Sequence, residues 1–134
     1  MSFGPYLAAA AFGLIKGLTS GPADDEHEFT LEHNFIGPVK EEVIYRGVPL
    51  WVKPNLPTGS TAAVFAIDHI LHDMRMHSLA GTHMKPMELV ARLGDVFLGG
   101  MLYEAAFRGS GILGAIGAHT IHNAGVTLGS KVRR

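Results

Sequence analysis

The sequence predicts an all-α protein, a multi-span transmembrane helical bundle of about four to five helices. Long apolar segments recur along the chain, strand-like alternation is nowhere sustained, and short runs of turn-forming residues separate the apolar segments. The chain is 47% apolar and only 17% charged, whereas average proteins contain about 25% charged residues. Its 134 residues are enough for one such bundle and too few for a multidomain enzyme.

Five helical segments are expected in order along the chain. The first, Phe3–Leu18, has no positive charge before its apolar run, so we expect a retained helix and not a secretory signal. The others are expected at Phe35–Val52, Thr61–Leu79, Met87–Phe107 and Gly109–Ser130. The last holds 22 residues without Asp, Glu, Lys or Arg. At about 1.5 Å per residue, it is long enough to cross a hydrocarbon core of about 30 Å.

Polar connectors divide the chain into three parts. Residues 1–34 are expected to form an N-terminal hydrophobic helix and an acidic connector, which contains the run DDEHE at residues 24–28. Residues 35–130 form the core, and residues 131–134 form a basic tail. A soluble bundle of imperfectly amphipathic helices is the alternative, and composition alone does not separate the two.

Charge and cysteine content exclude several function classes. Eleven basic and twelve acidic residues give a net charge of −1, so the chain lacks the basic surface that nucleic-acid binding requires. Cysteine is absent, which excludes disulfides, thiolate zinc sites and cysteine nucleophiles. Eight histidines are many for so short a chain, and they are the first indication of chemistry.

The run EEVIYRG places three charged residues inside an otherwise apolar helix. Glu42 and Arg46 are four residues apart, so they share a helical face and can form an ion pair. Glu41 is rotated about 100° from Glu42 and lacks that partner. An unpaired carboxylate in apolar surroundings suits a general base. A solvated helix face with a surface ion pair is the alternative.

Two further groups lie in later apolar helices. In the run FAIDH, Phe65 and His69 share a helical face, although a lone histidine on such a face is more often a satisfied core residue. In HTIHN, His119 and Asn123 are four residues apart and project to one side. Two neutral donors that converge in a dry site are what a developing oxyanion requires. An interhelical hydrogen bond that only holds the bundle together is the alternative.

The order and spacing of these groups resemble a known three-motif signature. EEVIYRG, FAIDH and HTIHN match EExxxR, FxxxH and HxxxN of the CPBP family, which contains CAAX proteases and bacteriocin-processing enzymes and is also called the Abi family. The stretch FLGGMLYEAAFRGSGILGAIGAHTIHNAG resembles the last two helices of that family. The likeness runs from about Phe35 to Gly129 and implies that residues 35–130 are a CPBP-like protease core in an integral membrane protein.

The resemblance implies an intramembrane glutamic endopeptidase that needs no cofactor and no metal. Glu41 matches the glutamate that activates the attacking water together with His69. His119 and Asn123 match the residues that stabilise the tetrahedral oxyanion. The supporting residues are Glu42, Arg46 and Phe65. The expected partners are a membrane-associated peptide or protein substrate and the lipid bilayer. A homo-oligomer is also compatible with the sequence. So few helices need contacts from a second copy to enclose a polar site.

Two alternative functions stay open. A metal-dependent membrane hydrolase would use zinc to activate water, and the chain offers five clustered candidates for its ligands: Asp68, His69, His72, Asp73 and His77. No HExxH motif is present, so this alternative ranks below the metal-free one. The other alternative is a non-catalytic membrane scaffold or immunity protein of the same fold. The chain is shorter than most members of the resembling family and lacks several flanking helices.

Overall fold

A computed structural model describes residues 3–19 and 30–133 of the chain, and every regular element within these ranges is helical. The elements are, in order, α1 (Gly4–Thr19), η2 (Glu32–Ile36), α2 (Gly37–Glu42), η3 (Val43–Gly47), α3 (Val48–Val52), α4 (Ser60–Leu79) and α5 (Pro86–Arg133). The all-α prediction is confirmed for these residues. The acidic run at residues 24–28 lies outside the described residues.

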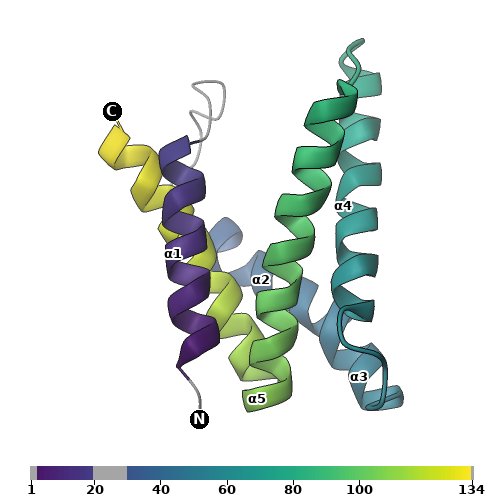
Figure 1. The fold of residues 1–134 in the computed structure, drawn as a ribbon, viewed down its shortest axis with the longest axis vertical. Helices are drawn as coiled ribbons and strands as arrows, with labels where there is room; N and C mark the ends of the chain where they lie inside the picture. Colours follow the sequence, from purple (N-terminus) through teal and green to yellow (C-terminus); the bar gives the residue numbers. More distant parts are fainter. Residues whose placement is uncertain (1–2, 20–29, 134) are drawn as a thin grey trace.

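Gly111 divides α5 into two helical halves. Its φ of 67° and ψ of −162° are not helical, and this backbone conformation is essentially restricted to glycine. We call residues 86–110 the first half of α5 and residues 112–133 the second half. Figure 1 shows α1 lying along the second half and α4 along the first half. The chain therefore has the five helical segments expected, with the expected turn between the last two.

The segment from η2 to α3 is less regular than expected. The sequence predicted one helix at Phe35–Val52, but the structure inserts a five-residue π-helical turn on each side of α2. Pro38 lies in the first turn of α2, where a missing backbone N–H costs no hydrogen bond. Helical segments with π turns are rare and often occur at functional sites.

Glycines allow α1 to lie directly against the backbone of α5. A β-carbon added at Gly13 would lie 2.2 Å from the carbonyl oxygen of His122, and one at Gly17 would lie 2.1 Å from that of Val126. Gly125 and Gly129 face the backbone of α1 in the same way. These contacts place the second half of α5 in a fixed position, because neither helix has a side chain in between.

A buried carboxylate fixes the other end of the bundle. Glu104 in the first half of α5 is fully buried and accepts hydrogen bonds from the backbone N–H of Gly59 at 3.0 Å and from the hydroxyl of Thr61 at 2.6 Å. Arg108 pairs with the same carboxylate at 2.8 Å and also donates to the carbonyl of Leu56. The start of α4 is therefore tied to α5, which sets the position of the rest of α4.

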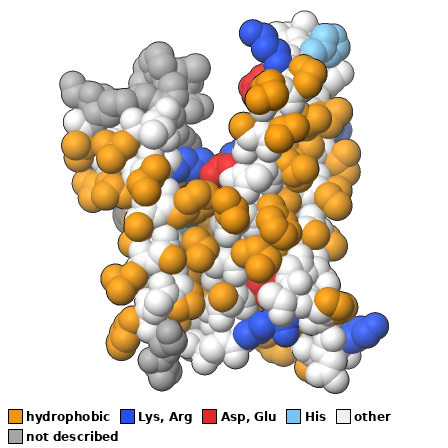
Figure 2. Space-filling model, in the orientation of Figure 1, with side chains coloured by type: hydrophobic (Ala, Val, Ile, Leu, Met, Phe, Trp, Pro, Cys, Tyr) orange, Lys and Arg blue, Asp and Glu red, His pale blue; other side chains and the backbone are white. Residues whose placement is uncertain are grey.

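Exposed apolar side chains cover much of the surface. On α4 they form a stripe at helical spacing, consisting of Val64, Ile67, Leu71 and Met74, each 48–59% exposed. Figure 2 shows such side chains spread over one face of the molecule, with charged groups in the notch and near the ends.

Within the described residues, no helix is both long and apolar enough to cross a membrane. The membrane span expected at Gly109–Ser130 is therefore not found. His119, His122 and Asn123 lower the mean hydropathy of that run.

The contact between α1 and α5 generates a stability prediction. Gly17→Ala should lower the free energy of unfolding by about 1–3 kcal/mol, because the added methyl group overlaps a backbone carbonyl and forces the helices apart. Gly94→Ala is the matched control, since a β-carbon at Gly94 meets no atom within 4 Å. It should raise stability by about 0.5–1 kcal/mol through helix propensity. Thermal unfolding of both variants in one detergent measures the difference, and equal stability of Gly17→Ala and wild type would contradict the packing described.

Candidate active site

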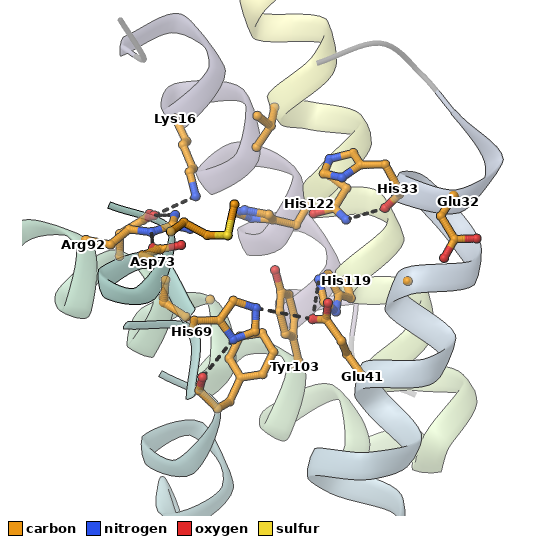
Figure 3. Close-up of a pocket in the computed structure, with 18 of the residues that line it drawn as sticks. Lys16, Glu32, His33, Glu41, His69, Asp73, Arg92, Tyr103, His119 and His122 are labelled. Carbon is orange, nitrogen blue, oxygen red and sulfur yellow. Dashed lines mark hydrogen bonds and ion pairs between the residues drawn. The ribbon is translucent and has the colours of Figure 1, made fainter. Parts of the chain in front are cut away.

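A pocket of about 850 Å³ lies between α1, α2, α4 and both halves of α5. All four residues expected to be catalytic line this pocket, namely Glu41, His69, His119 and Asn123. They come from three elements that lie far apart in the sequence (Figure 3). The helical arrangement therefore gathers the three motifs in one place.

Glu41 lies between the two histidines. Its Oε2 atom is 3.7 Å from Nε2 of His69 and 3.9 Å from Nε2 of His119. These separations are longer than a direct hydrogen bond, and contacts of this length are often bridged by water. The Glu41 side chain is 35% exposed, so solvent reaches it. The arrangement can hold a water molecule against one carboxylate and two imidazoles.

The hydrogen bonds of both histidines assign their tautomers. Nδ1 of His69 lies 2.9 Å from the carbonyl oxygen of Phe65, which can only accept, so this nitrogen carries the proton. Nδ1 of His119 lies 2.8 Å from Oε1 of Glu42, and Nη1 of Arg46 donates to the same oxygen at 3.1 Å. A carboxylate that already accepts from a guanidinium accepts from the imidazole as well. In the neutral form of each ring, Nε2 therefore has a free lone pair.

This assignment changes the expected role of His119. The sequence predicted a neutral donor, but Nδ1–H is used by Glu42 and the neutral ring has no proton on Nε2. His119 can donate to an oxyanion from Nε2 only when the ring carries a second proton.

The pair of Glu42 and Arg46 is a buried ion pair, not a surface one. Both side chains are fully buried, and the expected i,i+4 contact is present at 3.1 Å. Arg46 also donates from Nη2 to the carbonyl oxygen of Gly100 at 3.1 Å. Its guanidinium lies 4.3 Å from the ring centre of Phe65, which gives that phenylalanine a direct contact with the charge. Breaking a buried pair of this kind leaves an uncompensated charge, which is strongly destabilising.

Tyr103 is a pocket residue that the motifs did not indicate. Its ring stacks on His119, with 4.2 Å between ring centres and 12° between planes. The side chain is 3% exposed and lines the pocket. Gly99, one helical turn earlier on α5, lies beside the Tyr103 hydroxyl. Gly99 was the only feature of the sequence that could have drawn attention to Tyr103, and a glycine at this position does not indicate what the tyrosine does.

Asn123 lies one turn after His119 on the pocket wall. Its Nδ2 donates to the carbonyl oxygen of His33 at 2.9 Å, so one amide proton is used to hold η2 against α5. The amide group has a second proton that this bond leaves available. His119 and Asn123 thus line the same pocket, although the structure also gives Asn123 a contact that the sequence did not predict.

His122 occupies a different position from His119. It is 5% exposed, and its ring lies 5.2 Å from that of Phe12 and 5.9 Å from that of Tyr103, measured between centres. Its Nδ1 atom is buried without a hydrogen-bond partner among the described residues. The His122 ring instead has a backbone hydrogen bond with Ala9 of α1.

Four of the five residues considered for a metal site, all except His72, have other partners. The Tyr45 hydroxyl donates to Asp68, Arg92 pairs with Asp73 at 2.7 Å, and His77 bonds the hydroxyl of Thr82 at 2.8 Å. Across residues 3–19 and 30–133, no three His, Asp or Glu side chains are grouped so that they could hold a metal ion. The residues of the DHxxHD pattern all lie on α4, where they project from different faces of the helix. They therefore do not converge on one metal position.

Charged side chains from three helices line the outer part of the pocket. Lys16 of α1 pairs with Asp95 at 2.6 Å, and Arg92 contacts both Asp95 at 3.5 Å and Asp73 of α4 at 2.7 Å. Figure 2 shows charged atoms in the notch between the two halves of the molecule. The sequence analysis did not identify this network, because its members lie in separate segments with no shared motif.

Comparison with known proteins identifies the family. No curated protein and no solved structure matches the chain. The family model for type II CAAX prenyl endopeptidase, Rce1-like, matches residues 29–125, which is more than half of the chain. Members of that family are membrane proteases, which supports the enzyme class expected from the motifs. The chain therefore belongs to the Rce1-like family of type II CAAX prenyl endopeptidases.

Proposed function

We propose that this protein is an intramembrane endopeptidase that hydrolyses a peptide bond with a water molecule activated by Glu41 and His69. The observation that carries the proposal is the convergence of three acceptor atoms in one pocket: Oε2 of Glu41 and Nε2 of His69 and His119. The family description makes a prenylated CAAX peptide the first substrate to test. The bilayer is the expected environment, and a homo-oligomer is compatible with the proposal.

The first step uses the two acceptors on α2 and α4. A water molecule between them donates one hydrogen to Glu41 and the other to Nε2 of His69, which directs a lone pair at the substrate carbonyl carbon. As the oxygen–carbon bond forms, Glu41 takes the proton. The same proton then passes to the amide nitrogen, the carbon–nitrogen bond breaks, and a carboxylic acid and an amine are released.

The second requirement is stabilisation of the tetrahedral oxyanion. Asn123 offers the amide proton that His33 does not use, and His119 offers Nε2–H when its ring is protonated. Glu42 holds the other side of the His119 ring, which keeps Nε2 facing the pocket. Donors fixed in advance are effective because they need no reorganisation when charge develops.

Two observations support a membrane environment. Family membership is one. The other is the large number of exposed apolar side chains on α4 and on the first half of α5, such as Ile67, Leu71 and Val90 at 55–64% exposure. In water, a contiguous apolar surface of this kind would favour association or aggregation.

Membrane embedding is tested by alkaline carbonate washing of membranes from cells that express the protein. The protein should stay in the pellet, because apolar contact with lipid is insensitive to high pH whereas electrostatic attachment is not. A peripheral marker protein in the same sample should be released. Release of this protein with the marker would contradict embedding while leaving the site assignment in place.

The catalytic proposal predicts that Glu41 is the most sensitive position. Glu41→Gln keeps the shape and hydrogen bonding of the side chain and removes the base, so cleavage should fall by about 10²–10⁴. Glu88→Gln is the matched control, because Glu88 lines the outer pocket but contacts neither histidine. The measurement is cleavage of a fluorogenic prenylated CAAX peptide, supported by comparison of terminal peptides between wild-type and Glu41→Gln membranes.

Three outcomes would favour the alternatives. Full activity of Glu41→Gln would remove the base assignment. Activity that disappears with a chelator and returns with zinc would favour a metal-dependent hydrolase. No difference in terminal peptides between wild type and variant, together with no peptide cleavage, would favour a non-catalytic scaffold or immunity protein.

His119 and Asn123 are predicted to act on the transition state, whereas His122 is dispensable for it. Asn123→Ala should lower kcat about a hundredfold or more with nearly constant KM, since one lost oxyanion donor costs about 2.7–4 kcal/mol in the barrier. His122→Ala should change the unfolding temperature more than the rate. Steady-state kinetics and thermal unfolding of both variants test this. Loss of turnover in folded His122→Ala, with Asn123→Ala active, would show that the motif register is wrong.

A further inference from the structure

Tyr103 combines burial with an unused polar group. The side chain is 3% exposed and belongs to the central core with Phe65 and Val96. Its ring is held on several sides, by flat stacking on His119 and by an edge contact to Phe65 at 6.2 Å between centres. A phenylalanine would fill this space equally well, so packing alone does not account for the hydroxyl group.

Among the described residues the Tyr103 hydroxyl has no hydrogen-bond partner, and the oxygen is open to the pocket and not sealed in the core. A hydroxyl group at a pocket wall is satisfied by water or by a ligand in the pocket. Tyr103 lines the pocket, and Figure 3 shows its hydroxyl directed into the pocket. The atom therefore faces the space that a peptide would occupy, with its donor available.

The groups around the Tyr103 hydroxyl indicate which acceptor it would bind. In the proposed mechanism, a bound water donates its two hydrogens to Glu41 and to Nε2 of His69. A peptide entering the pocket brings carbonyl oxygen, which is an acceptor. Because Tyr103 stacks on His119, the two side chains present their polar atoms from adjoining positions on the pocket wall.

We propose that Tyr103 is a further catalytic residue, whose hydroxyl donates a hydrogen bond to the carbonyl oxygen of the scissile peptide bond as it becomes an oxyanion. The inference rests on the proposed function and extends it. No proton is transferred: the phenol stays protonated and the hydrogen bond shortens as negative charge develops. The Tyr103 ring has a second effect. It stacks on His119 and restrains the plane of that ring, while Glu42 holds the edge of the ring at Nδ1.

The experiment compares three variants with the fluorogenic prenylated CAAX peptide. Tyr103→Phe removes the donor and keeps the ring, so kcat should fall about 10²-fold while KM stays nearly constant. Tyr103→Leu removes both and should lower kcat further. Tyr6→Phe is the matched control, because Tyr6 also packs against the core but does not line the pocket. It should behave as wild type.

Each outcome has a defined meaning. Wild-type kinetics in Tyr103→Phe would overturn the inference and leave the proposed function in place. A loss confined to Tyr103→Leu would assign the ring alone and overturn the donor role, as would a rise in KM at constant kcat. No cleavage by wild type would overturn the proposed function and the inference with it. Thermal unfolding of Tyr103→Phe alongside Tyr6→Phe separates a lost donor from a misfolded protein.

Discussion

The buried carboxylate of Glu42 is the group on which the rest of the site depends. Its Oε1 atom accepts from Arg46 and from Nδ1 of His119, so one oxygen connects η3 to the second half of α5. Arg46 in turn donates to the carbonyl of Gly100 in the first half of α5 and lies over the Phe65 ring of α4. A charge this deep is tolerated only when it is paired and hydrogen-bonded. The network around its Oε1 atom therefore also fixes four helical segments relative to one another, namely η3, α4 and the two halves of α5.

Close backbone packing is the second constraint, and it explains how so small a chain surrounds a polar pocket. α1 contacts the second half of α5 through Gly13 and Gly17, without intervening side chains. α4 approaches the first half at Gly100, where an added β-carbon would lie 3.1 Å from Ala62. The break at Gly111 lets each half of α5 carry one helical partner. The pocket lies between the two pairs, and η2 and α2 close its remaining side.

The sequence predicted features that depend on local spacing and missed those that depend on contacts between distant residues. The five helical segments, the turn before Gly111 and the Glu42–Arg46 pair follow from apolar periodicity, glycine and an i,i+4 interval. The hydrogen bond from His119 to Glu42 joins residues that are 77 positions apart, and no pattern of apolar residues along the chain predicts it. The same holds for Tyr103, which has only a neighbouring glycine as a signal. The π turns around α2 were also missed, because the residues that form them match an ordinary helix.

The distribution of donors and acceptors in the pocket gives the proposed reaction a direction. On one side, Glu41 and the Nε2 atom of His69 can only accept hydrogens when the rings are neutral, so they orient a water molecule and not a carbonyl group. On the other side, the second amide proton of Asn123 and the hydroxyl proton of Tyr103 are donors that an acceptor satisfies. In the proposed reaction, the peptide bond lies between them with its carbonyl oxygen toward the donors and its carbonyl carbon toward the water. His119 contributes to both sides, because Glu42 fixes Nδ1 and leaves Nε2 to accept or donate as its protonation changes. In the proposed reaction, this asymmetry directs the attacking water to one face of the peptide bond.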